Sequence, residues 1–207
     1  MLAHRPSKIV CVGRNYLEHA RELGNDVPSE PLIFLKPPSS LIDSGESIVL
    51  PTMSQQVEFE GEIGVVVGQR LRNVSEADAP TGIAGIVAIN DVTARDLQKR
   101  DSQWTRAKGF DTFCAVGTPR AGVGDLGALE VVTRVNGRER QRGKSAEMAF
   151  SIPFLISYIS RIMTLEPGDL IATGTPAGVG KLVPGDTVEV DVIGVSTVTN
   201  PVAAAPV

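Results

Sequence analysis

This sequence has little of what marks secreted, membrane or nucleic-acid-binding proteins. Its two cysteines, Cys11 and Cys114, follow no signal-peptide core in the N-terminal string MLAHRPSKIVCVG, which predicts reduced thiols rather than a disulfide framework. No apolar run approaches the ~20 residues of a membrane span. The net charge of -4 argues against a nucleic-acid surface. We therefore expect a cytoplasmic protein with neither nucleic acid nor membrane as a partner.

Histidine is also scarce, since the chain holds only two. His4 lies in an expected flexible tail, so an imidazole general base would have to be His19. Glu22 follows three residues later on a predicted helix over 16–23, and such side chains can meet. A carboxylate on one ring nitrogen would fix the tautomer and leave the other nitrogen free to take a proton. A surface helix with a mixed charged face is the alternative.

What the chain does have is enough material for one packed domain. It has 207 residues, 42% of them hydrophobic and 21% charged, which predicts folding rather than disorder, and its 21 Gly and 14 Pro favour many turns. We expect a single α+β domain over 1–207, rich in mixed β-sheet, with flexible tails at 1–6 and 203–207. Strands are predicted over 7–13, 33–36, 48–50, 58–68, 83–90, 129–135, 187–193 and 196–199, and helices over 16–23, with Asn15 as its N-cap, and 151–162.

Two short strings concentrate acidic residues beside apolar runs. Glu60 and Glu62 lie in EFEGEIGVVVG, and residues two apart on a strand point to the same face. Asp91 ends the next apolar run, in VAINDVTARD. Three such carboxylates would suit a hard divalent ion bound through oxygen. The alternatives are an exposed acidic edge with Glu58, Glu60 and Glu62 pointing outward, and a turn role for Asp91.

Other polar strings are open to two interpretations. Two lysines could hold a substrate carboxylate or oxyanion, or be ordinary surface residues. They are Lys108 in RAKGFDTFCAVG and Lys36 in FLKPP. The polar stretch over 92–113 predicts a functional loop or short helix. The string ATGTPAGVGK lacks the spacing and the Ser or Thr of a phosphate-binding loop. Its turn would either bring Thr175 to a ligand or be a plain tight turn.

Taken together and in order, these strings resemble the fumarylacetoacetate hydrolase family. The resemblance spans residues 7–202 and includes GRNYLEHARELG, IFLKPPSSLI, EFEGEIGVVVG, INDVTARDLQ, AKGFDTFCAVG, TLEPGDLIATGTPAGVG and GDTVEVDVIGVSTVTNPV. It points to the short, single-domain branch that contains acylpyruvases, fumarylpyruvate hydrolases and relatives acting on oxaloacetate. The resemblance implies a mixed β-sheet roll or barrel and a homodimer.

The same resemblance implies roles for individual residues. It implies Glu60, Glu62 and Asp91 as ligands of Mg²⁺ or Mn²⁺, with Ca²⁺ as a substitute in a crystal. It implies His19, Glu22 and Lys108 as catalytic residues. The implied substrate contacts are Arg14, Lys36, Arg95, Gln98, Gln141 and Thr175. Ala146 stands where relatives often carry Thr, although Gln141 is kept.

The implied activity is that of a metal-dependent hydrolase of aromatic catabolism. Its partner would be a small keto acid, a 2-oxo or 2,4-dioxo acid that reacts through a metal-bound enolate. The first expectation is carbon–carbon bond hydrolysis of an acylpyruvate such as acetylpyruvate or fumarylpyruvate. The alternatives are an oxaloacetate decarboxylase or keto–enol tautomerase, a 2-hydroxyhepta-2,4-diene-1,7-dioate isomerase, and a non-catalytic relative that binds the metal and a keto acid.

Overall fold

Most of the described chain is built into three β-sheets. The computed structural model describes residues 2, 5–22 and 28–206, with only the backbone described at 19–21. The seven-stranded sheet has the order β2 (Leu32–Lys36), β1 (Ile9–Gly13), β12 (Leu170–Ala172), β6 (Gly61–Val67), β7 (Ile83–Asp91), β9 (Cys114–Val116) and β3 (Leu41–Asp43). The five-stranded sheet has the order β11 (Arg138–Lys144), β10 (Glu130–Val135), β14 (Thr187–Val192), β15 (Ser196–Ala204) and β4 (Ile48–Leu50). The three-stranded sheet has the order β13 (Gly180–Lys181), β5 (Val57–Phe59) and β8 (Thr93–Ala94).

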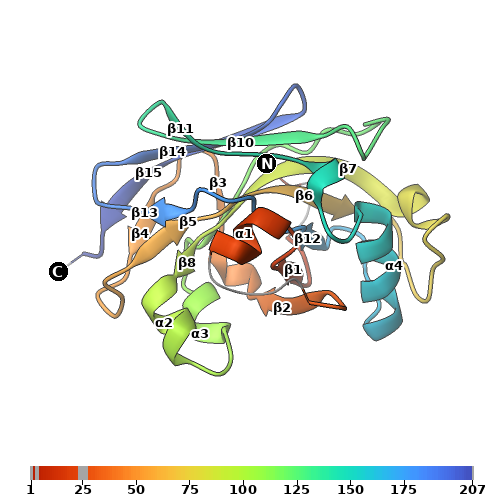
Figure 1. The fold of residues 1–207 in the computed structure, drawn as a ribbon, viewed down its shortest axis with the longest axis horizontal. Helices are drawn as coiled ribbons and strands as arrows, with labels where there is room; N and C mark the ends of the chain where they lie inside the picture. The colour runs from red at the N-terminus through yellow and green to blue at the C-terminus, as the bar shows by residue number, and fades with distance from the viewer. Residues whose placement is uncertain (1, 3–4, 23–27, 207) are drawn as a thin grey trace.

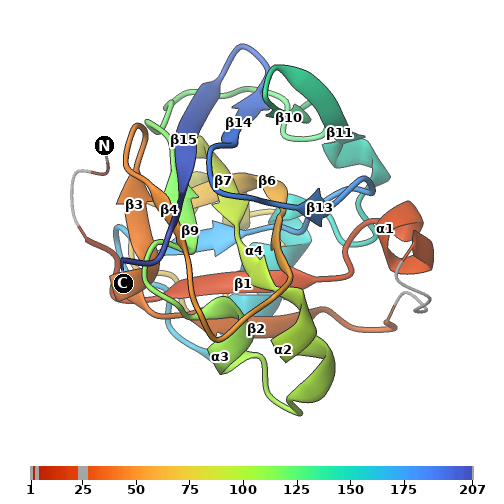
Figure 2. The same cartoon turned by 90° about the vertical axis from the view of Figure 1, so that its left-hand side faces the viewer.

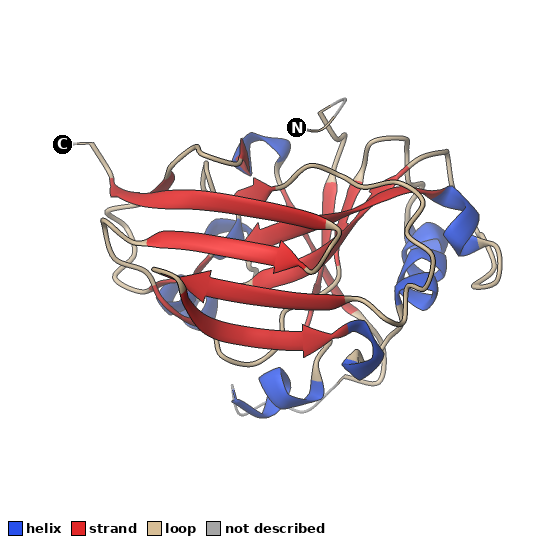
Figure 3. Ribbon diagram, turned by 90° about the horizontal axis from the view of Figure 1, so that it is seen from above, coloured by secondary structure: helices blue, strands red, loops and turns tan. Residues whose placement is uncertain are grey.

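The sheets are mixed and curl around one another. The pairs β1–β12, β3–β9 and β15–β4 are parallel, whereas the other pairs are antiparallel. The five-stranded sheet covers the strands β6 and β7 of the larger sheet (Figure 1), and its long strands are seen face-on in Figure 3. The prediction of an α+β, β-rich roll is therefore confirmed.

Helices cover the ends and one side of this roll (Figure 2). They are α1 (Leu17–Glu22), α2 (Arg95–Arg100), α3 (Thr105–Lys108) and α4 (Ile152–Ile162), with 3₁₀ turns at Pro38–Ser40, Ala79–Gly82 and Ser145–Glu147. Helix α4 is preceded by its N-cap Ser151, whose hydroxyl accepts a hydrogen bond from the Phe154 N–H. Within the described ranges, we find no helix long and apolar enough to cross a bilayer.

The main core lies between the two larger sheets and α4. Strands β6 and β7 are buried on both faces, whereas β14 and β15 alternate buried and more accessible residues. The apolar residues of α4 recur at helical spacing and close one side of the core. Core members from these elements include Ile63, Val65, Ile86, Ala88, Ile152, Ile156, Ile159, Val190 and Val192.

Several local predictions are confirmed and two need correction. The strand predicted over 129–135 forms as β10, and it continues into a hairpin at Asn136 and Gly137, where both residues have positive φ, as a tight two-residue turn requires. Asn15 was predicted to cap a helix, but its amide accepts from the Phe150 N–H and donates to the Phe150 and Thr173 carbonyls. The stretch 92–113, predicted as a loop or short helix, contains the short helices α2 and α3. The predicted tail over 203–207 is wrong in its first part, because Ala203 and Ala204 pair with β4.

Asp169 anchors the start of β1 to the loop before β12. Its buried carboxylate accepts hydrogen bonds from the Ser7 N–H and hydroxyl, the Lys8 N–H and the Glu166 N–H, and it pairs with the Lys8 ammonium. Burial alone would raise the pKa of Asp169, but these hydrogen bonds outweigh it and hold the pKa below its usual value.

Asp169→Ala is expected to lower the free energy of unfolding by about 3 kcal/mol, because it leaves several buried donors without an acceptor. A lowered native pKa gives stability that is present above the unfolded pKa near 4 and is lost as pH falls through the native pKa. The loss should therefore be full at pH 7 and smaller at pH 3. Urea titrations at both pH values check this, and an equal effect at both would contradict the electrostatic part.

Candidate metal centre

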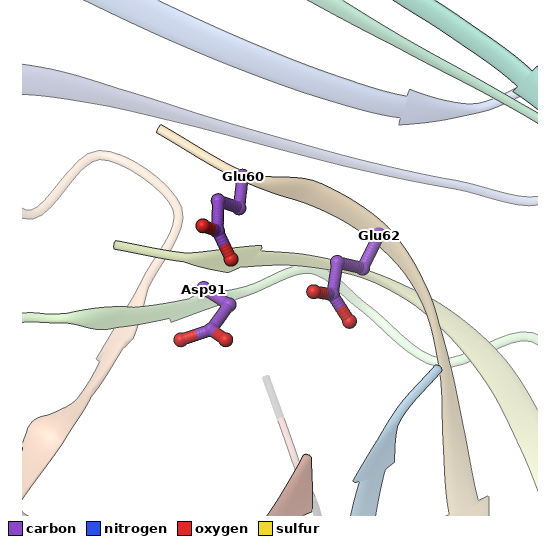
Figure 4. Close-up of side chains that lie close together, drawn as sticks. All are labelled: Glu60, Glu62 and Asp91. Carbon is purple, nitrogen blue, oxygen red and sulfur yellow. The ribbon is translucent and has the colours of Figure 1, made fainter. Parts of the chain in front are cut away.

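Glu60, Glu62 and Asp91 converge on one point because two neighbouring strands change sheets there. Glu62 lies in β6 and Asp91 ends β7, and these strands pair with Gly61 opposite Asn90. The Asp91 N–H donates to the Glu60 carbonyl at 2.8 Å, and the Glu60 N–H donates to Asn90 Oδ1 at 3.0 Å. One carboxylate oxygen from each acid lies within 4.8 Å of the others. Figure 4 shows the three carboxylates directed to the same side of the sheet.

Glu60 itself stands between two strands, which corrects the sequence prediction. The expected strand over 58–68 is divided into β5 and β6, and the chain passes at Glu60 from the small sheet to the large one. The alternative of an exposed acidic edge is also wrong. Glu58, Glu60 and Glu62 are 7%, 5% and 1% exposed.

Three buried cations offset much of this negative charge. Lys108 donates to Glu60 at 2.7 Å and to Asp91 at 2.6 Å, so its ammonium bridges two of the three acids. Lys36 donates to the other Asp91 oxygen at 2.6 Å and to the Val92 carbonyl. Arg95 pairs with Glu60 and also with Glu58. Buried charges are tolerated only when paired in this way.

These pairings fix the charge state of the cations. Burial works against the charged form of Lys108, but the charges of Asp91 and Glu60 outweigh it and raise its pKa. Burial also works against the charge on Arg95, and Glu60 and Glu58 raise the pKa of that guanidinium. Both side chains are therefore cationic at neutral pH. The surface-lysine interpretation of Lys108 is wrong, since the residue is 2% exposed.

Glu62 is the acid with the least compensation. Its described hydrogen bond comes from the Gly174 N–H at 2.7 Å. Burial raises the pKa of Glu62 well above its usual value, and the charges of Asp91 and Glu60 add to that effect. Gly174 adopts φ +105°, and a Cβ there would lie 2.8 Å from the Asn15 Cβ. Only glycine places this N–H against Glu62 without strain.

Gln141 and Lys36 lie behind the site rather than in its cavity. The Gln141 side chain accepts from the Gly61 N–H and donates to the Thr175 hydroxyl and the Pro176 carbonyl. The Thr175 hydroxyl in turn donates to the Gly61 carbonyl at 2.9 Å. These contacts hold the peptide between Glu60 and Glu62, so Gln141 positions the acids. Both predicted substrate contacts, Gln141 and Lys36, are absent from the described lining of the cavity.

A cavity of about 330 Å³ opens above the three carboxylates. The other predicted site residues that line it are Lys108, Arg14, Arg95, Gln98 and Thr175. Gln98 accepts a hydrogen bond from Arg95, which links it to Glu60. Sequence reasoning missed the apolar walls of Val12, Phe34 and Trp104, because their strings carry no recognisable chemistry. It also missed Asn90, whose position beside Asp91 was the available signal.

The predicted pair of His19 and Glu22 is only partly covered by the described residues. His19 belongs to α1, but its side chain lies outside the described residues, so its contact with Glu22 stays a prediction. Both Glu22 carboxylate oxygens accept from the Gly178 N–H, at 3.1 and 3.2 Å. This contact ties the end of α1 to the turn that follows Thr175.

The donor set fits a divalent cation that prefers oxygen. Three carboxylates match Mg²⁺, Mn²⁺ or Ca²⁺ in ligand type. Two oxygens on one ion with bonds of about 2.1 to 2.5 Å lie at most about 4.2 to 5 Å apart. The oxygen spacing within 4.8 Å is compatible with such an ion. A bound cation would also stabilise the ionised form of Glu62, whose carboxylate makes no ion pair among the described residues.

Mn²⁺ binding is expected to release a proton from Glu62 wherever the pH lies below the raised pKa of that carboxyl group. Its raised pKa keeps the proton on the carboxyl group to higher pH, and a ligand carboxylate must lose it. Affinity for Mn²⁺ should therefore rise with pH through the pKa of Glu62. Calorimetry in buffers of different ionisation enthalpy measures the proton released. An affinity that does not change with pH over the range in which the protein stays folded would contradict this expectation.

Comparison with known proteins gives consistent matches over nearly the whole chain. Residues 8–203 match the family model for the fumarylacetoacetate (FAA) hydrolase C-terminal domain. A mitochondrial oxaloacetate tautomerase of Arabidopsis thaliana is 46% identical over 198 residues, covering 92% of this chain and 90% of that protein. A fumarylpyruvate hydrolase structure from Pseudomonas aeruginosa, in complex with Mn²⁺ and pyruvate, has a TM-score of 0.92 at 30% identity, covering 96% and 90%. A 2-hydroxyhepta-2,4-diene-1,7-dioate isomerase structure from Mycobacterium marinum has a TM-score of 0.91 at 44% identity, covering 100% and 78%.

Proposed function

The chain belongs to the fumarylacetoacetate hydrolase family, and we propose that it is a divalent-metal-dependent enzyme that hydrolyses the carbon–carbon bond of an acylpyruvate. The observation that carries this proposal is the buried set of Glu60, Glu62 and Asp91 at the base of a cavity, with Lys108 bridging two of them. The hydrolase relative with bound Mn²⁺ and pyruvate supports Mn²⁺ or Mg²⁺ as the ion.

Glu60, Glu62 and Asp91 would hold the ion, which when bound supplies a Lewis acid for the oxygens of a 2-oxo acid. The protein's part is to keep the three acids fixed. Arg95 holds one Glu60 oxygen, and the Gly174 N–H holds Glu62. Such rigid support is what a catalytic site needs if charge is to be stabilised without rearrangement.

We assign the proton transfers to His19 and the stabilisation of negative charge to Lys108. His19, oriented by Glu22, takes a proton from a water molecule that attacks the carbonyl carbon farther from the carboxylate. The bond between that carbon and the neighbouring CH₂ then breaks, and its electron pair forms the enolate of pyruvate. The Lys108 ammonium, which contacts Glu60 and Asp91, donates to the enolate oxygen. The proton held by His19 returns to the enolate carbon, which gives pyruvate and a second acid.

A second candidate is an oxaloacetate tautomerase or decarboxylase, or a dienedioate isomerase. The tautomerase from Arabidopsis and the isomerase from Mycobacterium favour this alternative at 46% and 44% identity. These reactions form the same type of enolate by loss of a proton or of CO₂, so they would use Lys108 and the three acids in the same way. A non-catalytic keto-acid-binding protein is a weaker alternative.

We further propose that the protein is cytoplasmic and forms a homodimer.

The proposed function is tested by measuring turnover of acetylpyruvate, fumarylpyruvate and oxaloacetate with Mn²⁺, with Mg²⁺ and with EDTA. Hydrolysis requires pyruvate to form from acetylpyruvate or fumarylpyruvate only when the metal is present. Turnover of oxaloacetate alone would favour the second candidate. Full activity in EDTA would eliminate the metal-dependent mechanism, and no turnover of any of the three would favour the binding protein.

A further inference from the structure

Each acid of the candidate metal centre has one oxygen that is held by a donor of its own. The pairs are Arg95 with Glu60 Oε1, Lys36 with Asp91 Oδ1, and the Gly174 N–H with Glu62 Oε2. An oxygen that already accepts from a fixed donor is a poorer metal ligand, because the donor would repel the ion. The metal-facing oxygens are therefore the other three, which are Glu60 Oε2, Asp91 Oδ2 and Glu62 Oε1.

The Lys108 ammonium lies on two of these metal-facing oxygens. Its nitrogen is 2.7 Å from Glu60 Oε2 and 2.6 Å from Asp91 Oδ2. An ion bound to both oxygens at about 2.1 Å would lie no more than about 4 Å from that nitrogen, whichever side it approached from. Repulsion between a divalent ion and an ammonium is strong at this separation in a buried site. The ion and the ammonium therefore compete for the same two oxygens.

The other two buried cations are fixed by further contacts. Arg95 also donates to Glu58 at 2.7 Å and to Gln98. Lys36 also donates to the Val92 carbonyl at 3.1 Å, and it is absent from the described lining of the cavity. Neither cation can turn away from the acids without breaking its contacts with the rest of the protein.

Lys108 differs from these two cations because its side chain borders open space. It is the last residue of the short helix α3, and it lines the cavity. Beyond the two acids, its ammonium lies over the Phe34 ring, at 4.9 Å from the ring centroid. Rotation about the side-chain bonds can therefore carry the ammonium from the acids into the cavity, where an aromatic face still stabilises its charge.

We propose that Lys108 leaves Glu60 and Asp91 when a divalent ion binds, so that metal loading releases this lysine for the substrate. The inference rests on the proposed function, in that the released ammonium is the group assigned to the enolate oxygen. Before the ion binds, Lys108 compensates two buried carboxylates that would otherwise repel each other. After the ion binds, that compensation comes from the ion, and the ammonium faces the cavity. The metal must then bind before the keto acid, because only the released lysine can receive an anion.

The test measures how fast individual lysines react with acetic anhydride, by peptide mass spectrometry of the wild-type protein in EDTA and in saturating Mn²⁺. Mn²⁺ is expected to raise the rate at Lys108 by about tenfold or more, which is a common size for coupling between two sites. Lys36, on the other oxygen of Asp91, should stay protected in both conditions. Lys99, which lines the same cavity and is exposed, should react equally in both. An unchanged or lower rate at Lys108 in Mn²⁺, or an equal rise at Lys36, would overturn the inference.

Metal affinity gives a second measurement, because coupling between two sites is reciprocal. Lys108→Met should bind Mn²⁺ about tenfold more tightly than the wild type in calorimetric titrations, since no ammonium has to be displaced. Lys36→Met is the matched control. It removes the same charge from Asp91 but leaves the metal-facing oxygens unchanged, so the affinity should not rise. An equal rise in both variants would mean a general effect of charge and would overturn the exchange. The labelling needs no variant, and it decides the question where Lys36→Met does not fold.

Neither measurement needs turnover, so the exchange and the proposed reaction are tested separately. If Mn²⁺ releases Lys108 but acetylpyruvate and fumarylpyruvate are not hydrolysed, the proposed reaction fails and the exchange stands. If hydrolysis depends on Mn²⁺ while Lys108 stays protected, the exchange is overturned and the proposed reaction stands.

Discussion

Glu62→Gln is expected to reduce Mn²⁺ affinity by about 100-fold or more and to reduce turnover in parallel. The amide keeps an oxygen for the Gly174 N–H but removes one anionic ligand from the set of three. Among the three acids, Glu62 is the best one to change, since it makes no described ion pair, whereas Glu60 and Asp91 hold Lys108. Calorimetric titration with Mn²⁺ measures the affinity, and steady-state kinetics measures the turnover.

Without metal at pH 8, the Glu62→Gln variant should have a free energy of unfolding at least as large as that of the wild type. An acid with a raised native pKa loses native stability as pH rises through that value, because burying its charge is unfavourable. The amide removes this cost. Glu58→Gln is the control, since Glu58 belongs to the same EFEGE string but pairs with Arg95 outside the set of three. Equal loss of Mn²⁺ affinity in both variants would contradict the assignment of Glu62 as a ligand.

The sequence was informative about which acids lie close together in this site, and less informative about the contacts that hold them in position. The two-residue spacing of Glu60 and Glu62, and the apolar run after them, predicted neighbouring buried acids. The break at Glu60 was not predictable, because it depends on Asn90 and Asp91 about thirty residues away. Strand register over that separation is set by the packing of the sheets rather than by local pattern.

Burial of polar residues is the second feature that the local sequence does not reveal. The family resemblance implies substrate contacts for Lys36 and Gln141, and this implication stays a prediction. The structure buries both and uses them to hold Asp91 and Gly61. A side chain on a polar strand such as β11 is ordinarily exposed, so only the fold identifies Gln141 as a support. The family resemblance identified which residues gather here, but not which of them line the cavity.

Gly61→Ala is expected to lower the free energy of unfolding by about 3 kcal/mol or more and to displace the acids on either side of it. A Cβ at this position would lie 1.9 Å from Thr133 Oγ1 and 3.2 Å from Val190 Cγ1, so the strands β6 and β10 would have to separate. Overpacking of a core ordinarily costs about 1–3 kcal/mol, and an overlap this large lies at or beyond the upper end. Urea titration measures the loss, and Mn²⁺ titration measures the effect on the site.

Two variants at Thr133 decide whether this steric overlap is the cause. The Thr133 hydroxyl is buried and forms no hydrogen bond within the described chain, so its removal breaks no described polar contact. Thr133→Ala combined with Gly61→Ala should restore part of the stability and of the Mn²⁺ affinity, because it makes room for the new methyl group. Thr133→Val keeps the bulk and should restore neither. Equal recovery with alanine and valine would show that the hydroxyl, rather than the close approach of β10, makes glycine necessary between Glu60 and Glu62.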